Sequence, residues 1–395
     1  MKKHLIILVL FLIVPNVSFA KQLSKSFFIP DSVLNEFNSL SKEHKINVCF
    51  KNFDPFIDKI NEGLPMKIEG YNSKMDNTNR VKGTRSMSVL REFASATNYA
   101  FISENLELQE FLFNKLSEWA IEKALTKTRV CYTNIKGNFI LDDCEGYWQD
   151  PMGQDLAPTH DSSRTIEVIF GLNYLYNFWF IDYKENDSRH KTINEWFKPF
   201  HKRIKNVNDL DGKGDHGGQF FPNLLIKHSQ NKQYKNLVKK LIKGQDVLLQ
   251  NDGSIKDRTT RGNRALWYHH AGIGVAFVAM EIAKAADVKL PKNYEKKLLK
   301  AVELFHDASL DHSVIEPWAK KKHNSHTSNG KQDYKSDFNS TSHDSAWYHI
   351  IQYRYPNHRT SNFIKENMYP RATSLKADQK YGISLGCIYN ALANK

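Results

Sequence analysis

Apolar residues recur at intervals of three and four along most of the chain, which is the period of an α-helix with one buried face. The runs with this period cover residues 89–125, 166–181, 237–249, 271–286 and 298–310. Alternation of apolar and polar residues, the pattern of a half-buried strand, is scarce. The pattern therefore predicts an all-α protein.

Turn and breaker residues separate the helical runs. Glycine, proline and asparagine mark such breaks at residues 212–214, 251–253, 290–291 and 355–357. Helices joined by short links pack as hairpins in series, which gives either a bundle or an incomplete (α/α) toroid. No repeat of fixed period is present, and this disfavours a regular solenoid. Hairpin toroids commonly hold carbohydrate sites at their centre, but this link is an analogy of fold alone.

The N-terminus has the three parts of a secretory signal peptide. Lys2 and Lys3 precede an apolar run at residues 5–14, and small residues follow at 17–20. Residues 1–20 are therefore expected to be removed, so that the mature chain begins near Lys21 and acts in the periplasm or outside the cell. No later stretch approaches the roughly 20 apolar residues of a spanning helix, so no membrane span is expected.

The charge of the chain indicates a polyanionic partner. Its 56 basic and 43 acidic residues give a net charge of +13 at neutral pH. Nucleic acid and anionic polysaccharide both attract such a surface. Because an exported protein meets polysaccharide more often, we expect an acidic polysaccharide and not nucleic acid.

The chain has four cysteines, and all of them lie after the predicted signal peptide. An even number in an oxidising compartment is compatible with two disulfides. We favour Cys131 with Cys144, which closes a short loop, and this leaves Cys49 to join Cys387 near the other end of the chain. Neither the cysteines nor the histidines have the spacing of a metal site, so no metal or other cofactor is expected.

The densest group of chemically capable side chains lies at residues 258–270. It begins in a predicted loop and continues into a helix that starts near Ala265. Guanidinium groups bind carboxylates in pairs of hydrogen bonds, and aromatic rings stack on sugars, so the group suits an acidic sugar. Arg261 and Tyr268 are two helical turns apart and lie approximately on one side. In the alternative interpretation, the arginines pair with surface carboxylates and Tyr268 is a core residue.

The order of residues in this group resembles the signature of the alginate lyase family, the poly-mannuronate lyases. The resemblance rests on residues 252–253 and 261–269, with His216 at the place of an upstream family histidine. Residues 67–70 and 345–347 are similar to weaker family motifs. The resemblance implies one α/α toroid domain over residues 21–395, export, and lytic cleavage of a uronate polymer without an obligatory metal. We also expect a monomer.

The resemblance and the needs of β-elimination together suggest roles for three residues. The reaction removes the C5 proton next to a carboxylate, whose charge must be neutralised, and Arg261 is the candidate for that. Tyr268 is the candidate base and acid, because nearby cations favour its phenolate. His216 is a base for the opposite C5 epimer or a partner that tunes Tyr268. Six further residues are expected to bind substrate: Arg264, Lys67, Asp215, Trp267, His269 and Trp347.

The chain departs from the family around His216. Asp215 stands where the family has an asparagine, and an ionised Asp215 repels the substrate carboxylate unless it is protonated or bound to a cation. Residues 217–220 also replace a tyrosine–tryptophan pair of the family. The shared residues therefore predict the class of reaction, whereas the polymer stays open.

Two other functions are compatible with the sequence. A glycoside hydrolase needs two carboxylic acids at a set separation, which Asp161, Glu167, Asp215 and Glu316 could supply. A non-catalytic protein for binding or export of acidic polysaccharide fits the altered surroundings of His216. Residues 320–345 are polar and basic, and they are expected to form a long surface loop or a flap over an anionic substrate.

Overall fold

The computed structural model describes residues 28–68, 77–128, 130–135, 138–143, 169–205, 231–321, 331–332, 346–367 and 382–395. For residues 67–68, 77–85, 127–128, 130–135, 138–143, 202–205 and 231–232, the backbone alone is described. The predicted signal peptide lies outside these ranges. In the part that is described, no helix is long and apolar enough to cross a membrane.

The described chain is built mainly of α-helices, as the apolar periodicity predicts. They are α1 (Asp31–Ser39), α2 (Lys42–Cys49), α3 (Ile57–Asn61), α4 (Asn77–Ile102), α5 (Leu106–Ile121), α7 (Arg189–Lys205), α9 (Asn231–Leu248), α10 (Ala265–Ala285), α11 (Tyr294–Leu310), α12 (Glu316–Ala319), α13 (Trp347–Arg354), α14 (Arg359–Asn367) and α16 (Leu385–Ala393). Shorter turns are the π-helix η2 (Tyr176–Phe180) and the 3-10 helices η3 (Gly262–Arg264) and η4 (His312–Ile315).

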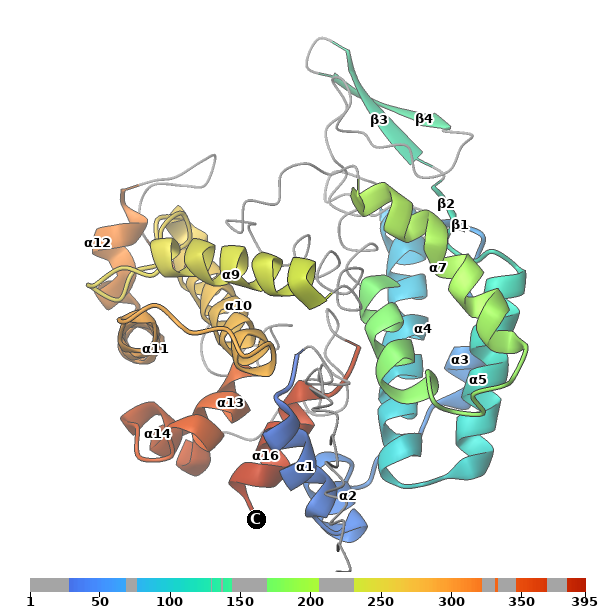
Figure 1. Ribbon diagram of the computed structural model, residues 1–395. Helices are drawn as coiled ribbons and strands as arrows, with labels where there is room; N and C mark the ends of the chain where they lie inside the picture. Colours follow the sequence, from blue (N-terminus) through green and yellow to red (C-terminus); the bar gives the residue numbers. More distant parts are fainter. Residues whose placement is uncertain are drawn as a thin grey trace, which may run out of the picture.

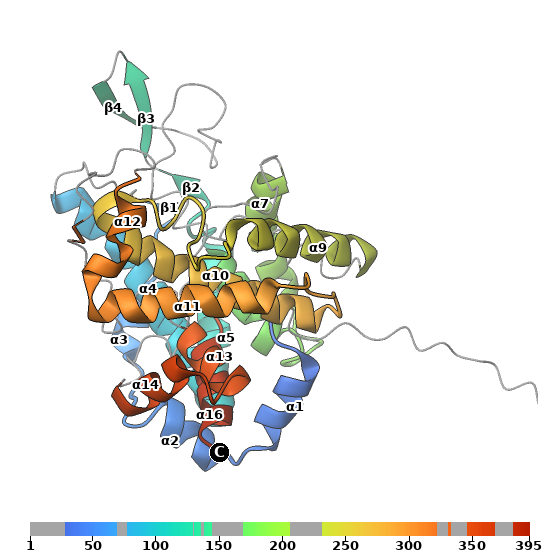
Figure 2. The ribbon, with the colours of Figure 1, turned by 90° about the vertical axis from the view of Figure 1, so that its left-hand side faces the viewer.

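Four short strands form two separate two-stranded sheets. β1 (Lys67–Ile68) pairs in parallel with β2 (Lys127–Thr128), and β3 (Val130–Ile135) forms an antiparallel hairpin with β4 (Asn138–Asp143). The hairpin stands away from the helices in both views (Figures 1 and 2). These strands are an addition to an α-helical fold.

Neighbouring helices pack against one another as hairpins. α4 packs on α5 and α5 on α7, while α10 packs on both α9 and α11. α13 packs on α16, which also contacts α1 and α2 from the start of the chain. Figure 1 shows the first set, the second set and the terminal set as three neighbouring groups. This arrangement is the predicted incomplete (α/α) toroid.

The long apolar run at residues 89–125 forms two helices because a turn interrupts it. Glu104 adopts a left-handed backbone conformation with φ of 56°, which ends α4. The side chain of Asn105 then accepts a hydrogen bond from the backbone N–H of Leu108 and so caps the start of α5. The cap turns one apolar stripe into a helical hairpin.

Helix α10 is the buried centre of its group. Nearly all of its residues from Ala265 to Ala283 are buried, including Gly272. A Cβ atom at Gly272 would lie 2.9 Å from Cδ1 of Ile255, so glycine lets the preceding loop pack closely on the helix. Gly253 has a φ of +85°, and a Cβ there would lie 2.6 Å from the carbonyl oxygen of Lys300. The loop before α10 is thereby held between α10 and α11.

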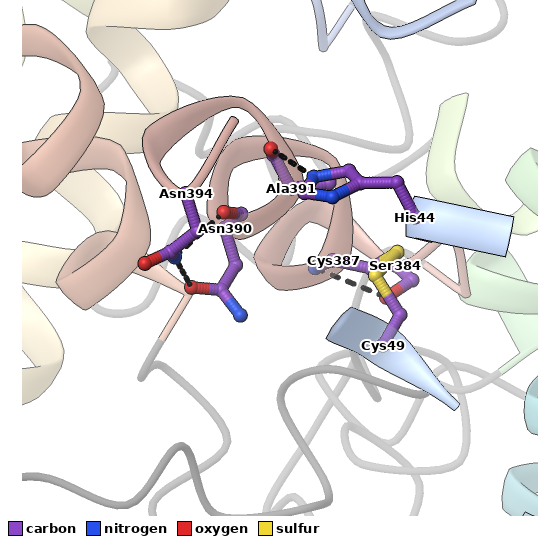
Figure 3. The surroundings of a disulfide bond; sticks show 7 residues. All are labelled: His44, Cys49, Ser384, Cys387, Asn390, Ala391 and Asn394. Atoms are coloured by element: carbon purple, nitrogen blue, oxygen red, sulfur yellow. Dashed lines mark hydrogen bonds between the residues drawn. A yellow bond between two sulfur atoms is a disulfide. The ribbon is translucent and has the colours of Figure 1, made fainter. Parts of the chain in front are cut away.

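A disulfide joins the two ends of the described chain. Cys49 at the end of α2 is bonded to Cys387 in α16, which confirms the predicted pairing. Figure 3 shows the hydroxyl of Ser384 accepting a hydrogen bond from the Cys387 N–H, and His44 donating to the carbonyl of Ala391 at 2.9 Å. The other predicted pairing involves Cys144, which lies outside the described residues, so it stays a prediction.

An ion pair around a buried carboxylate links α13 and α16 to α10. The guanidinium of Arg354 donates from Nε and Nη2 to the two carboxylate oxygens of Glu281, at 2.9 and 2.6 Å. The hydroxyl of Tyr389 also donates to Glu281. Glu281 is 1% exposed, so the carboxylate depends on these donors for its solvation. The network fixes α13 and α16 on the C-terminal half of α10.

Candidate active site

The candidate site is built by the loop between α9 and α10. An isolated bridge between Leu249 and Ile255 closes the first part of this loop around a turn at Asp252. The Asp252 carboxylate accepts hydrogen bonds from the backbone N–H and the hydroxyl of Ser254. The indole N–H of Trp318 in α12 donates to the same carboxylate at 3.2 Å. The bridge and three hydrogen bonds to Asp252 therefore fix the loop before it reaches the arginines.

Thr259 is the hydrogen-bonding centre of the second part of the loop. Its hydroxyl oxygen accepts from the Ile255 N–H at 2.8 Å and lies 2.8 Å from Nδ1 of His269. The other ring nitrogen of His269 lies 2.9 Å from the carbonyl oxygen of Ala301, which can only accept. Nε2 therefore carries the proton, and Nδ1 accepts a hydrogen bond from Thr259. Burial lowers the pKa of His269 to about 4, so the ring is neutral.

Arg261 and Tyr268 lie together where the loop enters α10. Arg261 precedes η3, and its Nε donates to the carbonyl of Asp257 at 2.8 Å. The guanidinium carbon of Arg261 lies 4.4 Å from the centre of the Tyr268 ring, and that of Arg258 lies 5.8 Å from it. Asp257 adopts a left-handed conformation with φ of 62°, which turns its carbonyl into this contact. Two cations thus face one phenol ring.

The surroundings of this pair are largely closed from solvent. Arg258 is 3% exposed, Arg261 8% and Tyr268 9%. In such a place the charges of the guanidinium groups are screened less than at the surface, so they favour a negative charge on a bound carboxylate. Trp267 covers the ring of Tyr268 edge-on, with 4.7 Å between the ring centres. The site thus places a phenol next to fixed positive charge.

Gln332 holds the start of α10 from the segment that follows α12. Its side-chain oxygen accepts from the Leu266 N–H at 2.9 Å, and its side-chain nitrogen donates to the carbonyl of Gly262 at 3.0 Å. The sequence places Gln332 in a predicted surface loop, yet the residue is only 9% exposed. Part of that segment therefore supports the site. No pattern in the neighbouring sequence predicts this role of Gln332.

Comparison with known proteins gives matches at the level of structure. No family model and no curated protein matches this chain. Alginate lyase A1-III from Sphingomonas species A1 matches with a TM-score of 0.55 and 13% identity, over 94% of this chain and 98% of that chain. Its Tyr-to-Phe variant complexed with tetrasaccharide matches over the same shares with a TM-score of 0.60 and 13% identity. A His-to-Ala variant complexed with tetrasaccharide gives 0.54, with 12% identity over 88% and 93%.

The chain has the alginate lyase fold. The match covers nearly the whole length of both chains, so it includes the helices on each side of the site loop. At this level of identity the likeness establishes the arrangement of the helices. The roles of individual side chains in this chain have to be argued from their own surroundings.

Two residues expected to bind substrate lie in the core of the alginate lyase fold. His269 is fully buried between Thr259 and Ala301, as described above. Trp347 is also fully buried and stacks on Phe277, with 5.9 Å between the ring centres. Neither side chain is exposed to a polymer, so the expected direct contacts are wrong for these two residues. His269 ties α10 to the site loop and to α11, and Trp347 packs α13 on α10.

The remaining expected residues fall into two groups. Arg264 is exposed and Trp267 is half-buried at the start of α10, next to the Arg261–Tyr268 pair. His216 and Asp215 lie outside the described residues, and for Lys67 the structure gives the backbone alone, in β1. Of the four carboxylic acids considered for hydrolysis, Glu316 is described, and it pairs with Lys320 at 2.8 Å. Among the described residues, no group of three histidines, cysteines or acids could hold a metal ion.

Proposed function

We propose that the protein is a polysaccharide lyase that opens a 4-linked, uronate-containing polymer by β-elimination. The observation that carries this proposal is the position of the Arg261 guanidinium, 4.4 Å from the ring centre of Tyr268, on an alginate lyase fold. A positive charge next to a phenol supplies the two functions that the elimination needs. The predicted signal peptide and the net charge of +13 agree with an anionic polymer as substrate in the periplasm or outside the cell.

Arg261 is proposed to neutralise the uronate carboxylate. Removal of the proton at C5 places negative charge next to that carboxylate, and a fixed cation lowers the energy of this charge. The bond from Nε to the Asp257 carbonyl fixes the direction of the guanidinium before substrate arrives. The closed surroundings of Arg261 strengthen the interaction.

Tyr268 is proposed to transfer the proton. As phenolate, its oxygen takes the proton from C5, the electron pair forms the C4=C5 double bond, and the C4–O4 bond breaks. The phenol then gives its proton to the departing O4, which restores the phenolate for the next cycle. Arg261 and Arg258 both lie over the ring, so positive charge is next to this group at the start of the reaction.

His216 is the proposed second base, for the opposite C5 epimer or as a partner of Tyr268. The solved alginate lyase A1-III structures include a Tyr-to-Phe and a His-to-Ala variant complexed with tetrasaccharide. These are the same two residue types that the sequence of this chain brings forward. Arg264, Trp267, Lys67 and Asp215 are proposed to contact the sugars around them.

The first test is ultraviolet absorbance of the mature protein with polymannuronate, polyguluronate, glucuronan, hyaluronan and bacterial capsular polymers. The C4=C5 double bond formed by elimination absorbs ultraviolet light. An increase in absorbance with one polymer therefore identifies both the reaction and its substrate. Tyr268→Phe should abolish the growth. Tyr353→Phe is a matched control, because it removes a phenol hydroxyl that binds Glu36 on the far side of the fold.

Two results would replace the proposal with another function. New reducing ends without new absorbance, retained in Tyr268→Phe, would indicate a glycoside hydrolase. Binding of polymer without new chain ends of either kind would indicate a non-catalytic protein for acidic polysaccharide.

A further inference from the structure

Helix α9 has two sharply different faces. Its buried face packs on α10 and consists of Tyr234, Val238, Leu241, Ile242 and Gln245. The exposed side carries Lys239, Lys240 and Lys243, together with Asn236 and Val247. In Figure 1 the helix crosses α10 and lies above α11 in the view.

The lysines form a regular line along the helix. Lys235, Lys239 and Lys243 follow one another at four-residue steps, so they lie on successive turns about 6 Å apart along the axis. Lys239 and Lys243 are exposed and Lys235 is half-buried, and the exposed Lys240 lies beside the line. We refer to Lys235, Lys239 and Lys243 as the α9 lysine line.

In the part of the chain that the structure describes, no acidic side chain pairs with this line. Among the described residues, none of the three lysines has an ion pair or a side-chain hydrogen bond, although many surface lysines elsewhere do. The acidic residue within α9 is Asp246, and Lys297 of α11 binds its carboxylate at 2.5 Å. Like charges one turn apart repel each other by a few tenths of a kcal/mol, so the line costs stability unless something binds to it.

We propose that the α9 lysine line is a secondary binding site for the part of an anionic polysaccharide chain that extends beyond the catalytic site. An extended uronate polymer carries one carboxylate per sugar, and the length of one sugar is comparable to the rise of one helical turn. The charges of the two therefore match in sign and in spacing. This inference rests on the proposed function, and it assigns to the chain a binding site outside the loop of Arg261 and Tyr268.

The position of the line agrees with this role. α9 ends at Leu248, and the loop that carries Arg258 and Arg261 begins directly after it, closed by the bridge from Leu249 to Ile255. A polymer that lies along the line with its end toward Lys243 is thus directed to the side of α9 where the catalytic loop begins. Such a site holds a long substrate between successive cleavages and leaves short fragments unaffected.

The test compares two triple variants with the same loss of charge. Lys235→Gln, Lys239→Gln and Lys243→Gln remove the line. Lys289→Gln, Lys292→Gln and Lys296→Gln remove three exposed lysines near the opposite end of α10, none of which has an ion pair among the described residues. Both sets are made in the Tyr268→Phe protein, so that binding is measured without turnover. Thermal unfolding checks that each variant is folded.

Affinity is measured by titration calorimetry with long polymannuronate, long glucuronan and the mannuronate tetrasaccharide, at low ionic strength and at about 0.15 M salt. Loss of the line should weaken binding of a long polymer by about tenfold at low salt, since each exposed pair contributes a few tenths to one kcal/mol. Tetrasaccharide binding should stay unchanged, and the control variant should change by less than about twofold. The salt dependence should also become shallower when the line is removed.

Equal weakening in both triple variants would overturn the inference, because the effect would then come from net charge alone. Unchanged affinity for both long polymers in the line variant would overturn it as well. The reaction is judged separately. If the wild-type protein gives no elimination but the line variant loses affinity selectively, the proposed function fails and the binding site stands. If elimination occurs and the line variant binds long polymers normally, the proposed function stands and the secondary binding site fails.

Discussion

The guanidinium carbon of Arg261 lies 4.4 Å from the centre of the Tyr268 ring, while its Nε is bound to the backbone carbonyl of Asp257. One contact fixes the cation and the other places it against the phenol. The chain therefore holds the two groups in a set geometry without help from a substrate. Preorganised charge of this kind contributes most to catalysis when water is excluded, as it is here.

Arg261→Gln should reduce the rate of elimination strongly. Glutamine keeps hydrogen-bonding capacity but removes the charge that opposes the developing carbanion, and loss of one such group typically costs a factor of about 10² to 10³ in kcat. The measurement is the initial growth of ultraviolet absorbance with the best polymer of the panel. Arg264→Gln is the matched control, since Arg264 is exposed three residues away. A smaller loss for Arg261→Gln than for Arg264→Gln would contradict the assigned role.

Thr259→Val should destabilise the protein through the site loop. The hydroxyl serves both the Ile255 N–H and Nδ1 of His269, and all three groups are buried. Valine has nearly the same shape but leaves a donor and an acceptor unpaired, which costs about 1–3 kcal/mol for each group. Urea unfolding of the two proteins measures the difference.

Thr97→Val is the control for that experiment. Thr97 is equally buried, but its hydroxyl donates to the Phe93 carbonyl one turn back in α4, which already takes part in the helix. Its replacement should cost less than the replacement of Thr259. Thr259→Ser should restore most of the stability, because serine keeps the hydroxyl. Equal losses for the two valine variants would show that the hydroxyl of Thr259 has no special role.

Much of the fold could be predicted from the sequence because the helices are amphipathic and their ends carry local signals. The break between α4 and α5 rests on Asn105, whose cap is a neighbouring interaction. The start of α10 at Ala265 was also predicted, because the polar residues of the loop end there. The pairing of Cys49 with Cys387 depends on an even cysteine count and on exclusion, and it is confirmed.

The parts of the site that the sequence did not predict depend on distant contacts. His269 and Trp347 carry chemistry that suits sugars, but the packing of α11 and α13 on α10 buries both. Gln332 lies in a polar segment, and its two bonds to the start of α10 join residues 66 and 70 positions apart. Trp318 reaches Asp252 across a similar separation. Residue type alone cannot distinguish a support from a contact with substrate.

Acid should destabilise the fold through its buried histidines. Burial lowers the pKa of His201, His269 and His349 to about 4, from the ordinary value of 6.5. Between these two values the unfolded chain binds protons that the folded chain does not, so the free energy of unfolding falls as the pH falls from 6.5 toward 4. The expected loss is on the order of a few kcal/mol for each histidine. Urea unfolding at pH 7.5 and at pH 4.5 measures it.

His269→Gln tests whether this ring takes part in the acid effect. Glutamine does not titrate, so the variant is less stable at neutral pH but loses less of its remaining stability on acidification. His312→Gln is the control, because His312 is exposed on η4. A pH dependence that is the same in His269→Gln and in the unmodified protein would contradict a proton-linked role for His269.

Removal of the Cys49–Cys387 disulfide should lower stability and leave the reaction unchanged in the protein that stays folded. The bond joins residues 338 positions apart, and closure of a loop of that length corresponds to about 6 kcal/mol in the chain-entropy model. The double variant Cys49→Ser, Cys387→Ser is compared with the unmodified protein by urea unfolding, and kcat is measured below the transition. α2 and α16 also pack directly, through His44 and Ala391, so the native contacts persist without the bond. A fall in kcat at full folding would show that the disulfide positions the site as well, which is not expected because Arg261 and Tyr268 are held by their own loop.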